Sequence, residues 1–163
     1  MNEIAEIING TLHSGIPVEI MEYSIDSRSV VTPEHTLFFA LTGNNHNGHD
    51  YIRTLYSDGM RAFVISEFRE EFNQLTGANF IVVENVLTAL QQLAAHHRQH
   101  TQAEVIGITG SNGKTVVKEW LYQLLANDHT VDRSPRSYNS QVGVPLSLLG
   151  LSLIHISEPT RLA

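Results

Sequence analysis

The chain has 163 residues, of which 42% are hydrophobic and 17% charged, as in an ordinary globular protein. Ten Lys and Arg against seventeen Asp and Glu give a formal charge of −7, which disfavours binding to nucleic-acid backbones. There is no Cys, so disulfides, thiolate catalysis and cysteine-ligated metals are excluded. We find no signal peptide and no apolar run of the ~20 residues that a membrane helix needs. These features predict a soluble, cytoplasmic α/β protein without membrane insertion.

Strand-like and helix-like patterns alternate along residues 1–100. Apolar spacing predicts helices over 2–9, 50–56 and 86–97, with Asp50 as the N-cap of the second. Apolar runs predict strands over 19–25, 36–41, 62–65 and 80–83. Strands separated by helices indicate a mixed sheet covered on its faces. We therefore expect a small N-terminal domain over residues 1–102, which ends in the polar stretch at 100–103.

The strongest motif is GITGSNGKT at residues 107–115, between a predicted strand at 105–109 and an amphipathic segment that starts at Val116. Glycines let several backbone N–H groups point at one anion, and a helix N-terminus adds partial positive charge. Lys114 would reach the terminal phosphates, and the Thr115 hydroxyl would bind Mg²⁺. Ile108 replaces the first glycine of the general phosphate-loop pattern, so the motif is a shorter G-x-x-G-K-T variant. An ordinary glycine-rich turn is the alternative.

Three further polar segments are candidates for ligand contacts. In the turn over 26–28, Arg28 offers a planar guanidinium suited to phosphate or carbonyl oxygens beside the Ser27 hydroxyl, although a structural cap is the alternative. GNNHNGH at 43–49 lies between a strand and a helix, where ligand loops usually occur, and a plain connector is its alternative. Asn139 and Gln141 are neutral amides that could orient substrate or metal-bound water.

TGSNGKT at 109–115 is similar to the loop of the Mur ligases, the ATP-dependent amide-bond ligases of peptidoglycan synthesis. The similarity extends to SIDSR at 24–28, LFFALTG at 37–43 and NGHDY at 47–51, which resemble the UDP-binding N-terminal domain of this family. SYNSQVGVP at 137–145 resembles the N-x-x-x-G-V-P segment of the members that add D-alanyl-D-alanine to UDP-N-acetylmuramoyl-tripeptide. VVKEW at 116–120 and SYNSQVGVP are most similar to the form of these ligases that some bacteria fuse to an alanine racemase.

The resemblance implies a ligase that uses ATP and Mg²⁺, and that is a monomer at full length. ATP phosphorylates the terminal carboxylate of UDP-N-acetylmuramoyl-tripeptide, and the amine of D-alanyl-D-alanine then displaces phosphate. The resemblance assigns catalysis to Lys114 and Thr115, and Mg²⁺ to Thr115. It assigns ATP binding to Gly110, Ser111, Asn112, Gly113, Lys114 and Thr115. It assigns the UDP-linked substrate to Ser27, Arg28, Gly43, Asn47, Gly48, His49, Asn139 and Gln141.

The C-terminal part of the chain is expected to be incomplete. Few residues follow the loop, so residues 103–150 are interpreted as the truncated start of a parallel-sheet P-loop ATPase domain. LSLIHISEPTR resembles a translated sequencing adapter, so residues 151–163 are interpreted as an artefact; a genuine strand is the alternative. We therefore expect this polypeptide to be inactive by itself. Other functions left open are the sibling ligase that adds the third amino acid, a non-catalytic UDP-sugar-binding module and an unrelated P-loop kinase.

Overall fold

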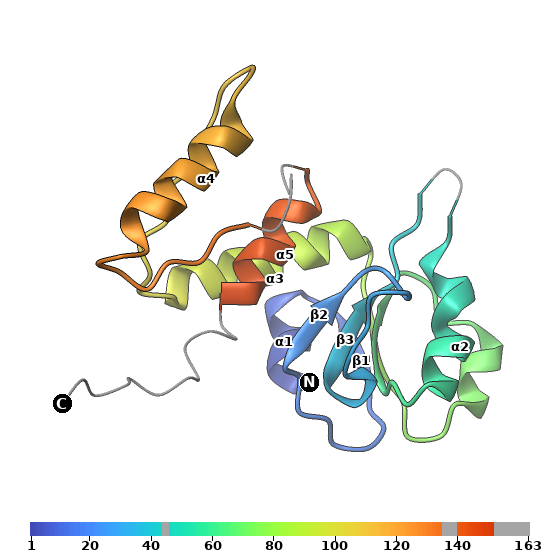
Figure 1. Cartoon of the computed structure of the whole chain (residues 1–163). Helices are drawn as coiled ribbons and strands as arrows, with labels where there is room; N and C mark the ends of the chain where they lie inside the picture. The colour runs from blue at the N-terminus through green and yellow to red at the C-terminus, as the bar shows by residue number, and fades with distance from the viewer. Residues whose placement is uncertain (44–45, 135–139, 152–163) are drawn as a thin grey trace.

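The computed structural model describes residues 1–43, 46–134 and 140–151 (Figure 1). The strands are β1 (Thr11–His13), β2 (Glu22–Ser24), β3 (Thr36–Phe39), β4 (Ala62–Ile65) and β5 (Asn79–Val82). The α-helices are α1 (Asn2–Ile7), α2 (Ile52–Ser57), α3 (Val86–His100), α4 (Lys114–Leu125) and α5 (Gly143–Gly150). Short 3₁₀ helices are η1 (Pro33–His35), η2 (Gly48–Tyr51) and η3 (Glu70–Gln74).

The strands form one mixed sheet in the order β1-β5-β4-β3-β2. The pairs β2–β3, β3–β4 and β4–β5 are parallel, whereas β1 is antiparallel to β5. Phe38 of β3 lies opposite Ser24 on one side and Phe63 on the other. Because β2, β3 and β4 are parallel, the segments that follow Ser24, Phe39 and Ile65 leave the sheet at the same edge. We call it the carboxyl edge.

Both faces of the sheet are covered by helices, so the central strands are apolar throughout. Along β4, Ala62 and Val64 belong to one buried cluster, which includes side chains of α1, α3 and α5. Phe63 and Ile65 point to the other face and belong to a second cluster with side chains of α2 and η3. The result is a three-layer arrangement with α2 opposite α1 and α3 (Figure 1). The predicted α/β fold with a small mixed sheet is confirmed.

Most of the predicted elements over residues 1–100 are present. The strand over 62–65 has the predicted bounds, and those predicted over 19–25, 36–41 and 80–83 are shorter or shifted. β1 was not predicted, because three residues are too few to show a pattern. The prediction that Asp50 is an N-cap was wrong. Asn47 caps η2 instead, by accepting a hydrogen bond from the His49 N–H, while Asp50 pairs with Arg69 at 2.9 Å.

The strand predicted over residues 105–109 is absent, so this prediction was wrong. Val105 and Ile106 are 46% and 62% exposed. A strand requires a neighbour that pairs its backbone groups, and the sheet of described strands does not extend to this segment. α4, which follows, has no buried side chain and projects from the rest of the molecule (Figure 1). The start of a parallel-sheet domain over 103–150 stays a prediction.

α5 packs against the body formed by the first hundred residues, chiefly against α3 and β2. Its Leu149 is 1% exposed and belongs to the same cluster as Leu90 of α3. Residues 143–150 therefore contribute a helix to the face that α1 and α3 cover, although they lie beyond the predicted boundary at 100–103. Residues 152–163 lie outside the described residues, so the adapter interpretation stays a prediction. No helix within the described part of the chain is long and apolar enough to span a membrane.

Candidate functional site

Most of the residues that the sequence predicts to bind ligands lie in two places: the carboxyl edge of the sheet and the loop before α4. The carboxyl edge carries Arg28 after β2, Asn47 and His49 after β3, and Ser66 directly after β4. In open α/β sheets, ligands bind outside the carboxyl ends of the strands, where the loops of neighbouring strands meet. The fold therefore makes this edge the first place to look for a binding site.

Arg28 forms a bidentate pair with Asp26 in the turn after β2. Its Nε and Nη2 donate to the two carboxylate oxygens at 2.9 and 2.8 Å. These hydrogen bonds lower the pKa of Asp26 to about 2. Asp26 raises the pKa of Arg28 in return, with a smaller contribution from Tyr51. The Arg28 side chain is 87% exposed. Since exposed ion pairs contribute little to stability, the guanidinium can exchange Asp26 for an anionic ligand at small cost.

Replacing Arg28 by alanine is expected to raise the pKa of Asp26 towards its ordinary value of 3.8, because the hydrogen bonds to the guanidinium are lost. A lowered pKa in the folded state stabilises the protein above the unfolded pKa, and this stabilisation is lost as the pH falls through about 2. The wild type should therefore lose more stability than the variant below about pH 4. A carboxyl ¹³C NMR titration measures the pKa. A value near 2 in the Arg28→Ala variant would contradict this assignment.

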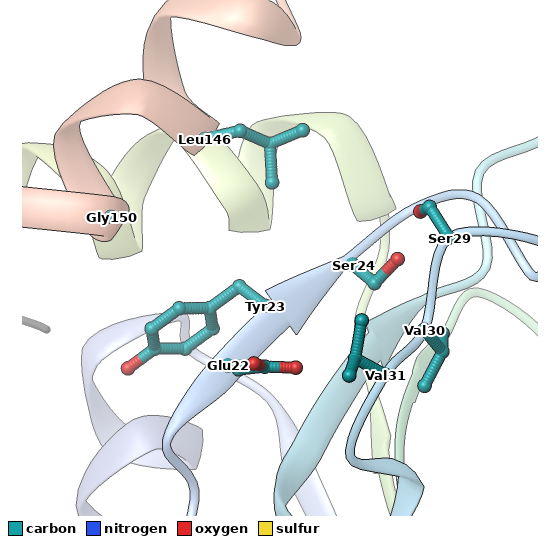
Figure 2. Close-up of a pocket in the computed structure, with 8 residues that line it drawn as sticks. All are labelled: Glu22, Tyr23, Ser24, Ser29, Val30, Val31, Leu146 and Gly150. Atoms are coloured by element: carbon teal, nitrogen blue, oxygen red, sulfur yellow. The ribbon is translucent and has the colours of Figure 1, made fainter. Parts of the chain in front are cut away.

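A hollow of about 260 Å³ opens beside this turn, where α5 crosses β2 (Figure 2). Figure 2 shows Leu146 on the α5 side and Tyr23 of β2 below it in the view. The hydroxyls of Ser24 and Ser29 both donate to the Asp26 carbonyl, at 3.1 and 3.0 Å, so the Arg28 turn forms one wall. Apolar walls with a few hydroxyls and one carboxylate suit an uncharged polar ring, such as a base or a sugar. The lining consists of Glu22, Tyr23, Ser24, Ser29, Val30, Val31, Leu146 and Gly150.

The predicted substrate residues between β3 and α2 are together but differ in exposure. Gly43 is exposed, and its N–H donates to the His46 carbonyl at 2.8 Å. His49 is only 3% exposed, Gly48 is buried, and the Asn47 side chain is hydrogen-bonded to His49. Of this group, Gly43 offers the most accessible backbone. Direct contact of any of these residues with a substrate stays a prediction.

The loop before α4 contains two glycines with positive φ angles. Gly110 and Gly113 have φ angles of +146° and +78°, which L side chains rarely adopt. The first helical hydrogen bond runs from the Val117 N–H to the Gly113 carbonyl, so the N–H groups of Lys114 and Thr115 precede the helical ladder. The first turn of α4 contains no acidic residue. N–H groups that precede the helical ladder, together with the positive end of the helix dipole, favour a bound anion here.

Lys114 and Thr115 both lie at this loop. The Lys114 Nζ donates to the Gly110 carbonyl, so the ammonium group lies over the loop. Thr115 is exposed in the first turn of α4, and Ser111 and Asn112 are exposed within the loop. This set of donors, one ammonium and one hydroxyl fits a nucleotide phosphate with its Mg²⁺. The assignment of ATP and Mg²⁺ to these residues stays a prediction.

The last two predicted substrate residues precede α5. Asn139 lies outside the described residues. Gln141 is exposed, and its backbone carbonyl accepts a hydrogen bond from Gln91 of α3 at 3.2 Å. Gln141 therefore anchors the start of α5 to the body. The contribution of α5 to the hollow was not predicted, because an apolar run such as GVPLSLLG predicts burial without indicating which strand it packs against.

Known proteins resemble this chain in both sequence and structure. The family model "Mur ligase family, catalytic domain" matches residues 19–98, which include the carboxyl-edge segments. The UDP-N-acetylmuramoyl-tripeptide–D-alanyl-D-alanine ligases of Bacillus subtilis and of Synechocystis are 30% and 37% identical to it. These alignments cover 93% and 85% of this chain but only 33% and 30% of those ligases.

Solved structures agree with the sequence matches. MurF from Acinetobacter baumannii aligns with a TM-score of 0.81 at 28% identity, over 93% of this chain and 33% of its own. MurF ligase from Thermotoga maritima, solved in complex with ADP, aligns with a TM-score of 0.65 at 30% identity, over 78% of this chain and 28% of its own. The chain thus spans about a third of the length of its relatives. It is homologous to MurF over this length, and it belongs to the Mur ligase family.

Proposed function

We propose that this chain supplies the UDP-muramoyl-peptide site and the nucleotide loop of a UDP-N-acetylmuramoyl-tripeptide–D-alanyl-D-alanine ligase. The observation that carries the proposal is that single alignments with such ligases cover 93% of the chain, and so include both the carboxyl edge and the phosphate loop. In the complete enzyme, the terminal carboxylate of the tripeptide is phosphorylated by ATP. The amine of D-alanyl-D-alanine then attacks the acyl phosphate, and phosphate leaves. We infer that this enzyme acts in the cytoplasm as a monomer.

The proposed substrate site combines the hollow at α5 with the Arg28 turn. Arg28 offers a planar, exposed fork that can bind one phosphate of a UDP diphosphate in a bidentate manner. The adjoining hollow offers Ser24 and Ser29 hydroxyls beside apolar side chains, which suits the uridine part. In this proposal residues 1–102 hold the UDP-linked substrate, and α5 closes one side of the site.

The chemical difficulty of the reaction is that a carboxylate must approach a triphosphate, so negative charge has to be neutralised. The loop N–H groups and the Lys114 ammonium are the groups of this chain that can do so. Lys114 exchanges the Gly110 carbonyl for a phosphate oxygen, a charge-assisted hydrogen bond that is stronger than the one it replaces. Mg²⁺, when bound, supplies further neutralisation of the transferring phosphoryl group, and Thr115 is the residue that would hold it.

Separate titrations of the 163-residue chain test the two sites. Binding of UDP-N-acetylmuramoyl-tripeptide is measured by calorimetry, and binding of MgATP by the fluorescence of Trp120, the one tryptophan, which lies on α4. Arg28→Ala is expected to weaken binding of the UDP-linked substrate about tenfold or more, the loss of a charged hydrogen bond, without affecting MgATP. Lys114→Ala is expected to weaken MgATP binding by a similar factor without affecting the UDP-linked substrate.

Arg53→Ala is the matched control for the Arg28 variant. Arg53 is also an exposed arginine beside a carboxylate, that of Glu71, but it lies on α2. It should leave both affinities unchanged. Binding of the UDP-linked substrate without any MgATP binding would favour a UDP-sugar-binding module over a ligase. Failure of the UDP-linked substrate to bind would refute the proposal.

A further inference from the structure

The His49 ring connects two segments of the carboxyl edge. His49 belongs to η2, which follows β3, and only 3% of it is exposed. Its Nε2 accepts a hydrogen bond from the backbone N–H of Ser66, directly after β4, at 3.1 Å. Its Nδ1 lies 2.8 Å from the Asn47 Oδ1. Because the Ser66 N–H can only donate, Nε2 carries the lone pair, and Nδ1–H donates to Asn47. The geometry therefore requires a neutral ring of one tautomer.

The backbone around His49 leaves little freedom for any other arrangement. A Cβ atom on Gly48 would lie 2.7 Å from the backbone of Ala40, so the chain passes directly against the end of β3. The Gly48 N–H also donates to the Leu41 carbonyl at 2.8 Å. The Asn47 Oδ1 accepts from the His49 N–H at 3.0 Å as well as from the ring, so one amide oxygen caps η2 and fixes the imidazole.

The Arg28 turn and η2 follow neighbouring parallel strands, β2 and β3, so both lie at the carboxyl edge. Tyr51, the last residue of η2, makes the smallest of the contributions that raise the pKa of Arg28. A displacement of η2 would therefore change the surroundings of the guanidinium, although His49 itself is buried. His49 thus joins the segments that follow β3 and β4, and these lie next to the segment that follows β2 at the carboxyl edge.

We propose that His49 is a positioning residue for the UDP-muramoyl-peptide site: its neutral imidazole joins Asn47 to the end of β4 and thereby fixes the carboxyl edge on which Arg28 lies. The inference rests on the proposed function, because it concerns binding of that substrate. His49 does not touch the substrate in this proposal. Its contribution is to hold the loop ends in the geometry that the substrate requires.

Protonation of His49 would remove this connection. A second proton on Nε2 would turn the acceptor into a donor that faces the Ser66 N–H, and the hydrogen bond would be lost. Burial lowers the pKa of His49, and so does the Arg69 guanidinium, whereas Glu67 and Asp50 oppose this shift. The unfolded chain therefore binds the proton first as the pH falls below about 6.5, and stability decreases until the pKa of the folded state is reached.

The test is the affinity of the full chain for UDP-N-acetylmuramoyl-tripeptide between about pH 5.5 and 8, a range in which carboxylates stay ionised. The wild type should bind with constant affinity above neutral pH and lose affinity as the pH falls from 6.5 towards the lowered pKa of His49. His49→Gln, which cannot reproduce both ring contacts, should bind about threefold to tenfold more weakly at pH 7.5, as expected for one lost hydrogen bond, and should lose the pH dependence. His129→Gln, at an exposed position after α4, is the control and should behave as wild type.

Thermal denaturation at each pH establishes that the variants are folded, and ¹⁵N NMR of the imidazole reports the tautomer without ligand. If His49→Gln binds as tightly as the wild type and retains its pH profile, the positioning role is overturned while the proposed function stands. An Nε2–H tautomer at neutral pH would also overturn it. If the wild type does not bind the substrate at any pH, the proposed function fails, and the positioning role fails with it.

Discussion

Replacing Phe63 by alanine is expected to lower the free energy of unfolding by about 3–5 kcal/mol, the range observed for a buried Phe in a close-packed core. Phe63 is completely buried at the centre of β4. Its ring stacks on Phe80 of β5 at 5.3 Å between centroids, within the cluster that α2 and η3 cover. Removing the ring leaves a cavity in the middle layer, where neighbouring strands are fixed by backbone pairing and cannot close it.

Urea denaturation followed by circular dichroism measures this loss, because the single tryptophan lies on α4, outside the core. Val31→Ala is the control: Val31 is 81% exposed, so the free energy of unfolding should change by less than about 0.5 kcal/mol. A loss below about 1.5 kcal/mol for Phe63→Ala would contradict the packing described for this face.

Replacing Asn79 by alanine is expected to cost about 2–4 kcal/mol, because it leaves buried backbone groups without partners. Asn79 starts β5 and is 2% exposed. Its Oδ1 accepts from the Gly15 N–H at 2.9 Å, and its Nδ2 donates to the carbonyls of Ile16 and Arg61 at 2.8 and 3.1 Å. One amide side chain therefore fixes the connection between β1 and β2 against the sheet.

The variant Asn79→Asp separates hydrogen bonding from shape. An ionised carboxylate of the same size would face two carbonyl oxygens, so it should destabilise the protein at pH 7 at least as strongly as alanine does. Burial and these carbonyls raise the pKa of such a carboxyl in the folded state. Relative to wild type, stability should then recover as the pH falls, because the protonated acid regains a donor. A difference in stability between Asn79→Asp and wild type that does not change with pH would contradict this expectation. The control is Asn73→Ala, at an exposed position in η3, which should leave the stability unchanged.

The core of the molecule could be predicted from the sequence because its strands are continuous apolar runs. LFFA and AFVI are apolar at every position, which predicts strands buried on both faces, and the structure confirms it for β3 and β4. The apolar spacing that predicts the helix over 86–97 places Leu87, Leu90, Leu93 and Ala94 on one inward face; the last three are buried in the structure, whereas Leu87 is half-buried. Spacing alone determines such faces, since a helix repeats every 3.6 residues.

The same reasoning failed where an element depends on a distant partner. The apolar run at 105–109 is as strand-like as β5, yet without a neighbouring strand among the described residues it forms none. β1 is the opposite case: TLH has no recognisable pattern, and its pairing with β5 places it in the sheet. The position of Asp50 alone predicted a helix cap, but in the structure Asn47 is the N-cap of η2. The Asn47 side chain is also hydrogen-bonded to the His49 ring.

The sequence by itself determined the local features of this protein: the apolar strands, the faces of α3, and a glycine loop that ends at Gly113, the left-handed N-cap of α4. Each of these depends on residues a few positions apart, so the pattern contains the information. Only the tertiary structure decided that α5 forms one wall of the hollow, that Asn79 holds the segment around Gly15, and that His49 joins the ends of two strands. Those contacts join groups far apart along the chain, and chain topology brings them within hydrogen-bonding distance.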